Sequence, residues 1–196
     1  MKKYYKVNDI FYSLQGEGHN VGRAAVFVRF SGCNLQCPFC DTDFSYYREM
    51  TAEEIVKNIT IELSKLNGEH PIVVLTGGEP SLQVDAALID LIHTAGFPFV
   101  TMESNGTKEP PANLDWLTVS PKTKPIVTHC NELKVIFNGK STVSDYGIKA
   151  SYYYLQPEDT GDAKRNADIT AACVEYIKRH PRWRLSLQIH KLINIK

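Results

Sequence analysis

Residues 24–40 read AAVFVRFSGCNLQCPFC, an apolar run that leads directly into three closely spaced cysteines. The run Ala24–Phe30 is rich in β-branched and aromatic residues, which favours a strand. Residues 31–50 contain Gly, Pro, Asn and Asp at many positions, and this composition is typical of a loop. This stretch therefore predicts a strand that ends in a loop of soft metal ligands, and it indicates both the fold class and the place of the site.

Predicted strands and helices alternate downstream of this loop. Thr51 and Glu54 form a capping-box pattern that begins a helix. Its apolar stripe is Ile55, Ile59, Leu63 and Leu66, and Asn67-Gly68 ends it. Residues 72–76 form a short, wholly apolar run that ends in Thr, as expected of a strand buried on both faces. A second helix is predicted over residues 84–95 and another strand over residues 97–103.

Weaker patterns complete the chain. Strands are predicted at Trp116–Val119 and at residues 132–137, 152–156 and 184–188. A helix is predicted over residues 162–179, and its apolar face would consist of Ile169, Cys173, Tyr176 and Ile177. This alternation favours an α/β fold with a mostly parallel sheet, in one domain that spans residues 1–196.

Polar and glycine-rich segments follow the predicted strands. They are residues 31–43, 76–80, 103–106, 120–122 and 156–159. The carboxyl ends of parallel strands lie at one edge of a sheet, where binding sites of this fold class form. We therefore expect these five segments to meet around one site.

Composition narrows the classes of function. The 196 residues include 22 Lys+Arg and 22 Asp+Glu, so the formal net charge is zero and no whole-domain attraction for nucleic acid is expected. Residues 1–12 lack the apolar core of a signal peptide, and no apolar run approaches about 18 residues. We expect a cytoplasmic protein without membrane contact.

The five cysteines are unevenly spread: Cys33, Cys37 and Cys40 lie together, whereas Cys130 and Cys173 stand alone. An odd count without a secretory signal argues against a disulfide framework. Thiolates suit zinc or iron–sulfur clusters. Structural zinc needs a fourth ligand, which Asp41, His19, Cys130 or His129 could supply. A [4Fe–4S] cluster on three thiolates would leave one iron open for a ligand. The two single cysteines are interpreted as small buried apolar residues.

The C-x3-C-x2-C spacing, with Phe39 before the last cysteine, resembles the signature of the radical S-adenosylmethionine (SAM) superfamily. Gly77-Gly78-Glu79-Pro80 resembles that superfamily's GGEP motif; otherwise it is a strand-to-helix turn with Glu79 near a helix N-terminus. The resemblance implies that SAM binds the open iron through its amino and carboxylate groups. Reductive cleavage of SAM would then give a 5′-deoxyadenosyl radical that takes hydrogen from the substrate.

Further segments resemble one family within that superfamily. They are Leu14-Gln15-Gly16-Glu17-Gly18, Cys40-Asp41-Thr42, Ser120-Pro121-Lys122, Gln156-Pro157-Glu158-Asp159 and WRLSLQIHK at residues 183–191. Together, from about Asp9 to the last residue, they resemble the 7-carboxy-7-deazaguanine synthase (QueE) family. This implies conversion of 6-carboxy-5,6,7,8-tetrahydropterin to 7-carboxy-7-deazaguanine with Mg²⁺, in queuosine biosynthesis. It also implies a homodimer and a flavodoxin or ferredoxin as electron donor.

The resemblance also assigns residues. Those expected to bind the substrate are Leu14, Gln15, Gly16, Glu17, Arg29, Thr76, His190 and Lys196. Glycine permits close backbone approach, and Arg29 can pair with the substrate carboxylate through two hydrogen bonds. Those expected to bind SAM are Phe39, Cys40, Asp41, Gly78, Glu79, Glu103, Ser120, Pro121, Lys122, Gln156, Pro157, Glu158 and Asp159. Thr42 is the implied Mg²⁺ ligand; Mg²⁺ keeps several waters and needs few protein ligands.

The chain is short for a full barrel of this superfamily. Pro110-Pro111 and the prolines of residues 121–125 stand where covering helices would be. We therefore predict a trimmed partial (β/α)6 radical SAM barrel in which loops replace some helices. Two alternatives remain at this stage: an activase of the same superfamily that makes a glycyl radical on a partner enzyme, and a non-catalytic zinc-binding module.

Overall fold

The computed structural model describes residues 2–38, 40, 43, 46–63, 70–140 and 142–196. The predictions that concern Phe39, Asp41 and Thr42 lie outside these residues, as do Leu66 and the Asn67-Gly68 stop predicted for the first helix. The helix itself ends earlier, at Glu62, with Leu63 as its C-cap. In the described part of the chain, no helix is both long enough and apolar enough to cross a membrane.

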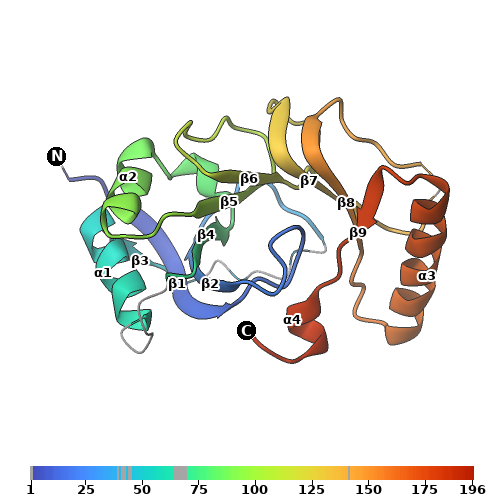
Figure 1. The fold of residues 1–196 in the computed structure, drawn as a ribbon, viewed down its shortest axis with the longest axis horizontal. Helices are drawn as coiled ribbons and strands as arrows, with labels where there is room; N and C mark the ends of the chain where they lie inside the picture. The colour runs from blue at the N-terminus through green and yellow to red at the C-terminus, as the bar shows by residue number, and fades with distance from the viewer. Residues whose placement is uncertain (1, 39, 41–42, 44–45, 64–69, 141) are drawn as a thin grey trace.

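A nine-stranded sheet organises the described residues (Figure 1). The strands lie in the order β3-β1-β2-β4-β5-β6-β7-β8-β9. Their bounds are β1 Tyr5–Leu14, β2 Ala24–Phe30, β3 Arg48–Met50, β4 Ile72–Gly77, β5 Val100–Ser104, β6 Trp116–Val119, β7 His129–Phe137, β8 Lys149–Pro157 and β9 Trp183–Leu185. Every pairing from β2 to β9 is parallel, whereas β1 is antiparallel to both β2 and β3.

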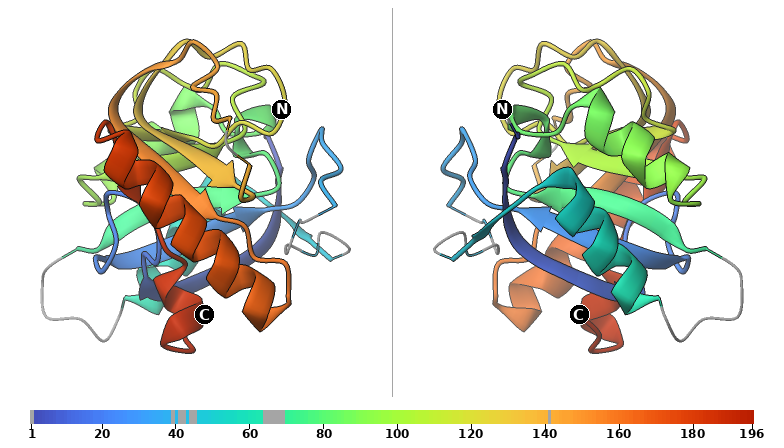
Figure 2. Two further views of the ribbon diagram at one scale, coloured as in Figure 1. Left: turned by 90° about the vertical axis from the view of Figure 1, so that its right-hand side faces the viewer. Right: turned by 90° about the vertical axis from the view of Figure 1, so that its left-hand side faces the viewer.

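The sheet curls into a partial barrel with its three longer helices outside and its short C-terminal helix at the open side (Figures 1 and 2). The helices are α1 Ala52–Glu62, α2 Ala86–Thr94, α3 Ala163–Arg179 and α4 Ile189–Leu192, with a 3₁₀ turn at Pro80–Leu82. Helices α1 and α2 contact each other at one end, and α3 covers β8 and β9 at the other. Among the described residues, the connections from β5 to β8 contain no helix, which confirms the predicted trimming.

Two apolar layers lie on opposite faces of the sheet. The larger one joins strand residues such as Val28 and Leu75 to helix residues such as Ile55 and Leu88. The smaller one, on the concave face, consists of Phe11, Ala25, Phe27, Ile72 and Val74. Successive residues of a strand face opposite sides, so the position after Val28 returns to the concave face. This alternation brings polar side chains into the barrel interior.

The first strand was not among the sequence predictions. Its pairing with β2 shifts register between Val7 and Asp9, and this irregularity interrupts the alternation that would have marked a strand. The short elements β3 and α4 were also not predicted. The parallel part of the described sheet contains the seven strands that the sequence predicted, and the last of them, β9, has only three residues.

Several predicted boundaries move for local reasons. Thr51 caps α1 as expected, since its hydroxyl accepts the Glu54 N–H and the Glu54 carboxylate accepts the Thr51 N–H. Helix α2 begins at Ala86 because Asp85 caps it. Strand β5 begins at Val100, after Pro98, which has no N–H to give the ladder. Strand β9 is shorter than predicted because Ser186 turns inward and donates to the Gln156 side chain.

Candidate active site

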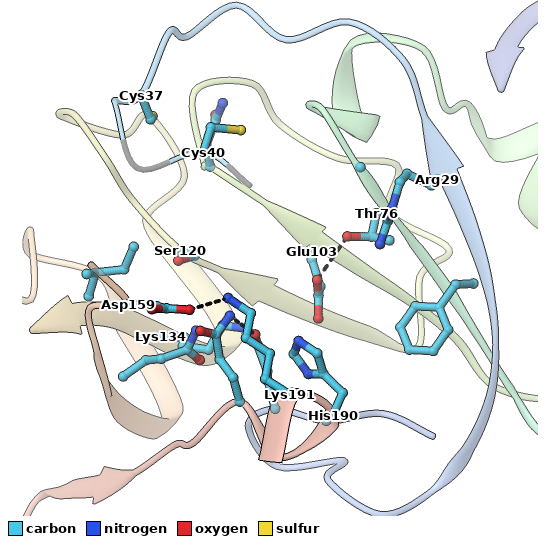
Figure 3. Close-up of a pocket in the computed structure, with 18 of the residues that line it drawn as sticks. Arg29, Cys37, Cys40, Thr76, Glu103, Ser120, Lys134, Asp159, His190 and Lys191 are labelled. Carbon is cyan, nitrogen blue, oxygen red and sulfur yellow. Dashed lines mark hydrogen bonds and ion pairs between the residues drawn. The ribbon is translucent and has the colours of Figure 1, made fainter. Parts of the chain in front are cut away.

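A cavity of about 440 Å³ opens at the carboxyl ends of the parallel strands. The cysteine loop and the C-terminal segment face each other across it, and Glu103 lies between them (Figure 3). The lining draws on every predicted polar segment: Cys33, Leu35, Cys37 and Cys40, then residues 76–78, 103–105, 120 and 122, and 156–159, followed by Gly161. The expected convergence of strand-end segments is therefore confirmed.

Cys33, Cys37 and Cys40 all line this cavity. The Leu35 N–H donates to Cys33 Sγ at 3.4 Å, and the Cys40 N–H donates to the Cys37 carbonyl at 3.1 Å. Burial raises the pKa of the Cys37 thiol, and Cys33 and Cys40 raise it further, whereas Lys122 opposes them. Three soft donors on one wall of a cavity fit an iron–sulfur cluster, in which each thiolate binds a different iron.

The alternative zinc ligands lie elsewhere. His19 packs against Trp116 and Tyr152, with ring centroids 4.7 and 4.2 Å away. Neither His19 nor Cys130 nor His129 lines the cavity, and in the described ranges no three His, Cys, Asp or Glu side chains are placed to hold a single metal ion. Asp41 is outside the described residues.

The two unpaired cysteines behave as expected of apolar residues. Cys173 is fully buried, and Cys130 packs half-buried against the core. Burial raises the pKa of the Cys173 thiol to about 11 and that of the Cys130 thiol to about 12. Both thiols therefore stay protonated near neutral pH.

The Gly77-Gly78 turn lies directly against the start of the cysteine loop. A Cβ atom on Gly78 would stand 2.0 Å from the Gly32 carbonyl oxygen, so only glycine fits. The Gly78 N–H donates to the Phe30 carbonyl at 2.9 Å, and the Glu79 N–H donates to the Gly32 carbonyl at 2.9 Å. Because Gly77 and Gly78 line the cavity, this close fit presents their backbone to a ligand held beside the cysteines.

Glu79 is fully buried and does not line the cavity. One carboxylate oxygen accepts the Ser81 N–H at 3.0 Å and the Ser104 hydroxyl at 2.8 Å. The other accepts the Asn105 N–H at 2.6 Å. In the structure this side chain therefore joins the turns after β4 and β5 and does not line the cavity in which SAM was expected to contact it.

Arg29, Thr76 and Glu103 stand on neighbouring strands and line the cavity (Figure 3). The Glu103 carboxylate accepts the Thr76 hydroxyl at 2.9 Å and the Gln15 amide at 3.1 Å. The Arg29 guanidinium lies 5.3 Å from the centroid of the Phe11 ring. All four polar residues were predicted to contact substrate or SAM, and the structure places them together.

Residues 14–17 line the cavity from the open side of the barrel. Glu17 forms a buried ion pair with Lys134 and also accepts the Gln188 amide at 3.0 Å. Burial alone would raise the pKa of Glu17, but Lys134, with Gln188, lowers it to about 2. The Gly16 carbonyl accepts the Ile189 N–H at 2.9 Å, which fixes this segment to α4.

Ser120 and Lys122 also line the cavity, whereas Pro121 between them is buried outside it. The Lys122 ammonium donates to the Ser120 carbonyl and hydroxyl at 2.8 and 2.5 Å. Burial, followed by repulsion from Lys134, lowers the pKa of Lys122 to about 8. This ammonium stands close enough to Cys37 for their charges to interact.

The predicted residues after β8 and at the C-terminus line the same cavity. Gln156, Pro157, Glu158 and Asp159 form one rim, and His190 and Lys196 form another. Hydrogen bonds from Lys191, the Gly161 N–H and Asn166 lower the pKa of Asp159 to about 2. Lys196 pairs with Asp9 at 2.5 Å, and its main-chain oxygen accepts the Ser13 hydroxyl at 2.7 Å.

Several lining residues were not predicted. They are Phe11, Phe27, Leu35, Ser104, Asn105, Lys134, Ile136, Gly161, Gln188 and Lys191. Lys134 carried a readable signal, since it is a lone cation in the otherwise apolar run Leu133–Phe137. Asn105 lay in a predicted strand-end segment without being assigned a contact; its amide donates to the Asn34 side chain at 3.0 Å.

Comparison with known proteins agrees with this geometry. Residues 27–123 match the family described as the Radical SAM superfamily. The chain is 45% identical over 195 residues to the 7-carboxy-7-deazaguanine synthase of Bacteroides thetaiotaomicron, which covers 97% of this chain and 98% of that protein. It is 41% identical over 215 residues to the synthase of Nitratidesulfovibrio vulgaris, covering 97% and 99%.

A solved structure is similar as well. The crystal structure of QueE from Escherichia coli superimposes with a TM-score of 0.74 at 27% identity and covers 95% of both chains. These relatives favour neither the glycyl-radical activase nor the zinc-binding module. The chain belongs to the 7-carboxy-7-deazaguanine synthase family of radical SAM enzymes.

Proposed function

We propose that this enzyme converts 6-carboxy-5,6,7,8-tetrahydropterin to 7-carboxy-7-deazaguanine, with ring contraction and loss of ammonia, in 7-deazapurine and queuosine biosynthesis. One observation carries the proposal: a single cavity joins the three cysteines to Arg29 and residues 14–17. The relatives are named for this product, and these polar groups suit a flat, carboxylated heterocycle as the substrate.

Cys33, Cys37 and Cys40 would hold a [4Fe–4S] cluster, and the backbone of Gly77 and Gly78 would receive SAM beside it. When bound, this cofactor pair supplies the one-electron chemistry that removes a hydrogen atom from the substrate. The Lys122 ammonium would neutralise the SAM carboxylate, and residues 156–159 would contact the ribose and adenine. Phe39 and Asp41, which lie outside the described residues, are proposed to contact SAM as well.

The chain's own residues orient the substrate. Arg29 offers two parallel N–H donors to the substrate carboxylate, and a Lys could not match that geometry. Glu17, Gln15 and Glu103 offer acceptors to ring N–H groups, while Thr76, His190 and Lys196 complete the walls. Residues 14–17 and α4 cover the open side of the barrel and so exclude water from the reacting centre.

The remaining proposals concern the magnesium ligand, the oligomeric state, the location and the electron donor. Thr42, outside the described residues, would bind Mg²⁺, which takes its other ligands from the substrate and water. We expect one radical SAM domain over residues 1–196, a homodimer, a cytoplasmic location, and a flavodoxin or ferredoxin as electron donor. No contact with nucleic acid or membrane is expected.

Anaerobic turnover tests the function. Protein reconstituted with iron and sulfide should be brown, with absorbance near about 400 nm. Incubated with dithionite, Mg²⁺, carboxytetrahydropterin and a substoichiometric amount of SAM, it should form more deazaguanine acid than the SAM supplied, because SAM is regenerated. Deoxyadenosine release without deazaguanine acid would retain the superfamily and overturn the substrate.

The cysteines provide the matched control for this assay. Cys37→Ala should lose cluster absorbance and turnover together, because one of three thiolates is gone. Cys173→Ala removes a buried thiol from the core and should keep the cluster. Full turnover by the Cys37→Ala protein would contradict the proposed cluster ligands.

A further inference from the structure

The floor of the cavity contains a buried charge cluster in which Lys134 is central. Its ammonium contacts the Glu17 carboxylate, and their side chains are only 7% and 15% exposed. Glu103 and Glu132 also lie close enough for their charges to act on it. Burial favours loss of the Lys134 proton, but the three carboxylates outweigh it, and the pKa of Lys134 is raised.

This arrangement fixes both oxygens of Glu17. Lys134 donates to Oε2, and Gln188 donates to Oε1 at 3.0 Å. An ionised carboxylate accepts about four hydrogen bonds, so each oxygen keeps one lone pair for a ligand. Glu17 and Lys134 both line the cavity, which places those free lone pairs within reach of a bound molecule.

The neighbouring glycine confirms how closely the segment is held. A Cβ atom on Gly18 would stand 2.0 Å from a Glu132 oxygen, and the Gly18 N–H donates to the Ser186 hydroxyl at 3.0 Å. The His19 N–H donates to the other Glu132 oxygen at 3.0 Å. Glu132 therefore fixes the backbone of this segment, whereas Lys134 fixes the carboxylate of Glu17.

We propose that Lys134 is a positioning residue which, through its buried ion pair, holds the Glu17 carboxylate as the acceptor for the N–H donors of the substrate's pyrimidine ring. The inference rests on the proposed function, because the 2-amino group and adjacent ring N–H of a pterin form a two-donor edge. A fixed carboxylate matches that edge with two charge-assisted hydrogen bonds. Lys134 thereby contributes to specificity without contacting the reacting atoms.

A purely structural ion pair would behave differently. Replacing a buried pair by apolar or neutral residues is often nearly neutral for stability, whereas removing one partner strands a charge. The double variant Glu17→Gln/Lys134→Met therefore separates the roles. It removes both charges, avoids a stranded carboxylate and keeps the side-chain lengths, so the protein folds even if Lys134→Met alone does not.

The experiment measures the KM for carboxytetrahydropterin and kcat in the reconstituted enzyme at several pH values. Lys134→Met and Glu17→Gln should each raise KM about 10- to 100-fold, the loss expected for a hydrogen bond to a charged group. The double variant should be no worse than Glu17→Gln. Lys134→Arg should restore part of the affinity.

The pH profile provides the second readout. In the wild type Glu17 stays ionised above about pH 4, so KM should be flat from pH 5.5 to 7, below the pKa of Lys122 of about 8. In Lys134→Met the burial of Glu17 is no longer offset, and KM should rise as the pH falls. The other ionisable groups that act on Glu17 or on Lys134 are His190 of α4, Glu132 of β7, Glu103 of β5 and Lys122 after β6. The double variant retains these four groups and should again be flat.

The outcomes are distinct. An unchanged KM in Lys134→Met, additive losses in the double variant, or a raised KM for SAM instead of the pterin would each overturn the proposal. Failure of the wild type to use carboxytetrahydropterin would instead overturn the proposed function. Lys178→Met, at an exposed ion pair on α3, is the matched control and should leave all parameters unchanged.

Discussion

At the scale of single residues, the shape of the cavity depends on positions where one added side-chain atom would displace the backbone. Gly78 is such a position, because its Cα lies against the Gly32 carbonyl next to Cys33. Neither backbone segment can yield alone, since hydrogen bonds from Gly78 and Glu79 tie them together. The glycine is required by close contact between two strand ends, not by a left-handed conformation.

Gly78→Ala should therefore destabilise the protein by about 3 kcal/mol and lower its iron content, because the methyl group displaces the start of the cysteine loop. Denaturant unfolding and iron analysis after anaerobic reconstitution measure the two effects. The control is Gly22→Ala, where the added Cβ meets open space and only the positive φ of 83° opposes it. Gly22→Ala should cost stability but keep its iron; equal iron content in both variants would contradict the steric argument.

The buried Glu79 carboxylate leads to a second prediction at this scale. Glu79→Gln replaces one acceptor oxygen with an NH₂ group that faces N–H or O–H donors, so at least one hydrogen bond from Ser81, Ser104 or Asn105 is lost. The free energy of unfolding should fall by about 1–3 kcal/mol. Glu175→Gln, at an exposed carboxylate on α3, is the control and should change it by under about 0.5 kcal/mol. If the Glu79→Gln protein had wild-type stability but bound SAM more weakly, that result would support the predicted direct contact between Glu79 and SAM.

These residues also mark how far sequence could predict the site. The cysteines and the Gly77-Gly78 turn were identified because their spacing is local and their chemistry has few alternatives. The role of Glu79 was misassigned because its partners Ser104 and Asn105 lie in the next strand-end turn, about 25 positions away. Lys134 was missed for the same reason: its partner Glu17 is 117 positions distant, and only the folded barrel joins them.

At the scale of elements, the same division between local and distant signals holds. Helices α1, α2 and α3 were predicted because each has a capping residue and an apolar stripe of its own. Strand β1 was missed because its identity as a strand comes from antiparallel pairing with β2 and β3, across an irregular register. Helix α4 has no side-chain cap and no buried residue, so its sequence contains no helical signal.

The capping box of α1 can be tested directly. Thr51→Ala removes the hydroxyl that accepts the Glu54 N–H, and the free energy of unfolding should fall by about 1 kcal/mol. Thr60→Ala in the same helix is the matched control, since that exposed hydroxyl only bonds the carbonyl of Val56 one turn earlier. Alanine there should be neutral or slightly stabilising. Equal losses at both positions in urea unfolding would argue against the cap.

At the scale of the whole molecule, the barrel is completed by segments from both ends of the chain. Residues 14–17 lie at the end of β1, and α4 is the last helix, yet the Gly16 carbonyl accepts the Ile189 N–H at 2.9 Å. Lys191 of α4 also bonds Asp159 at 2.8 Å, which joins the last helix to the end of β8. A ligand in the cavity would contact residues 14–17, α4 and the end of β8 together, and so would add contacts between segments that otherwise touch mainly at their edges.

Ligand binding should therefore stabilise the entire fold, and only when the cluster is present to anchor SAM. Binding to the native state alone adds about 2.7 kcal/mol at a ligand concentration 100 times Kd. For a chain of this length that corresponds to a rise in Tm of about 5–10 °C.

The measurement is anaerobic thermal unfolding of reconstituted protein with and without SAM. S-adenosylhomocysteine, which lacks the sulfonium charge, is the second ligand. The Cys33→Ser/Cys37→Ser/Cys40→Ser protein is the control: it keeps Gly78, Lys122 and residues 156–159 but has no thiolate to hold iron. A shift of equal size in this variant would mean that the polar walls bind SAM without the cluster, and the arrangement inferred from the three cysteines would be wrong.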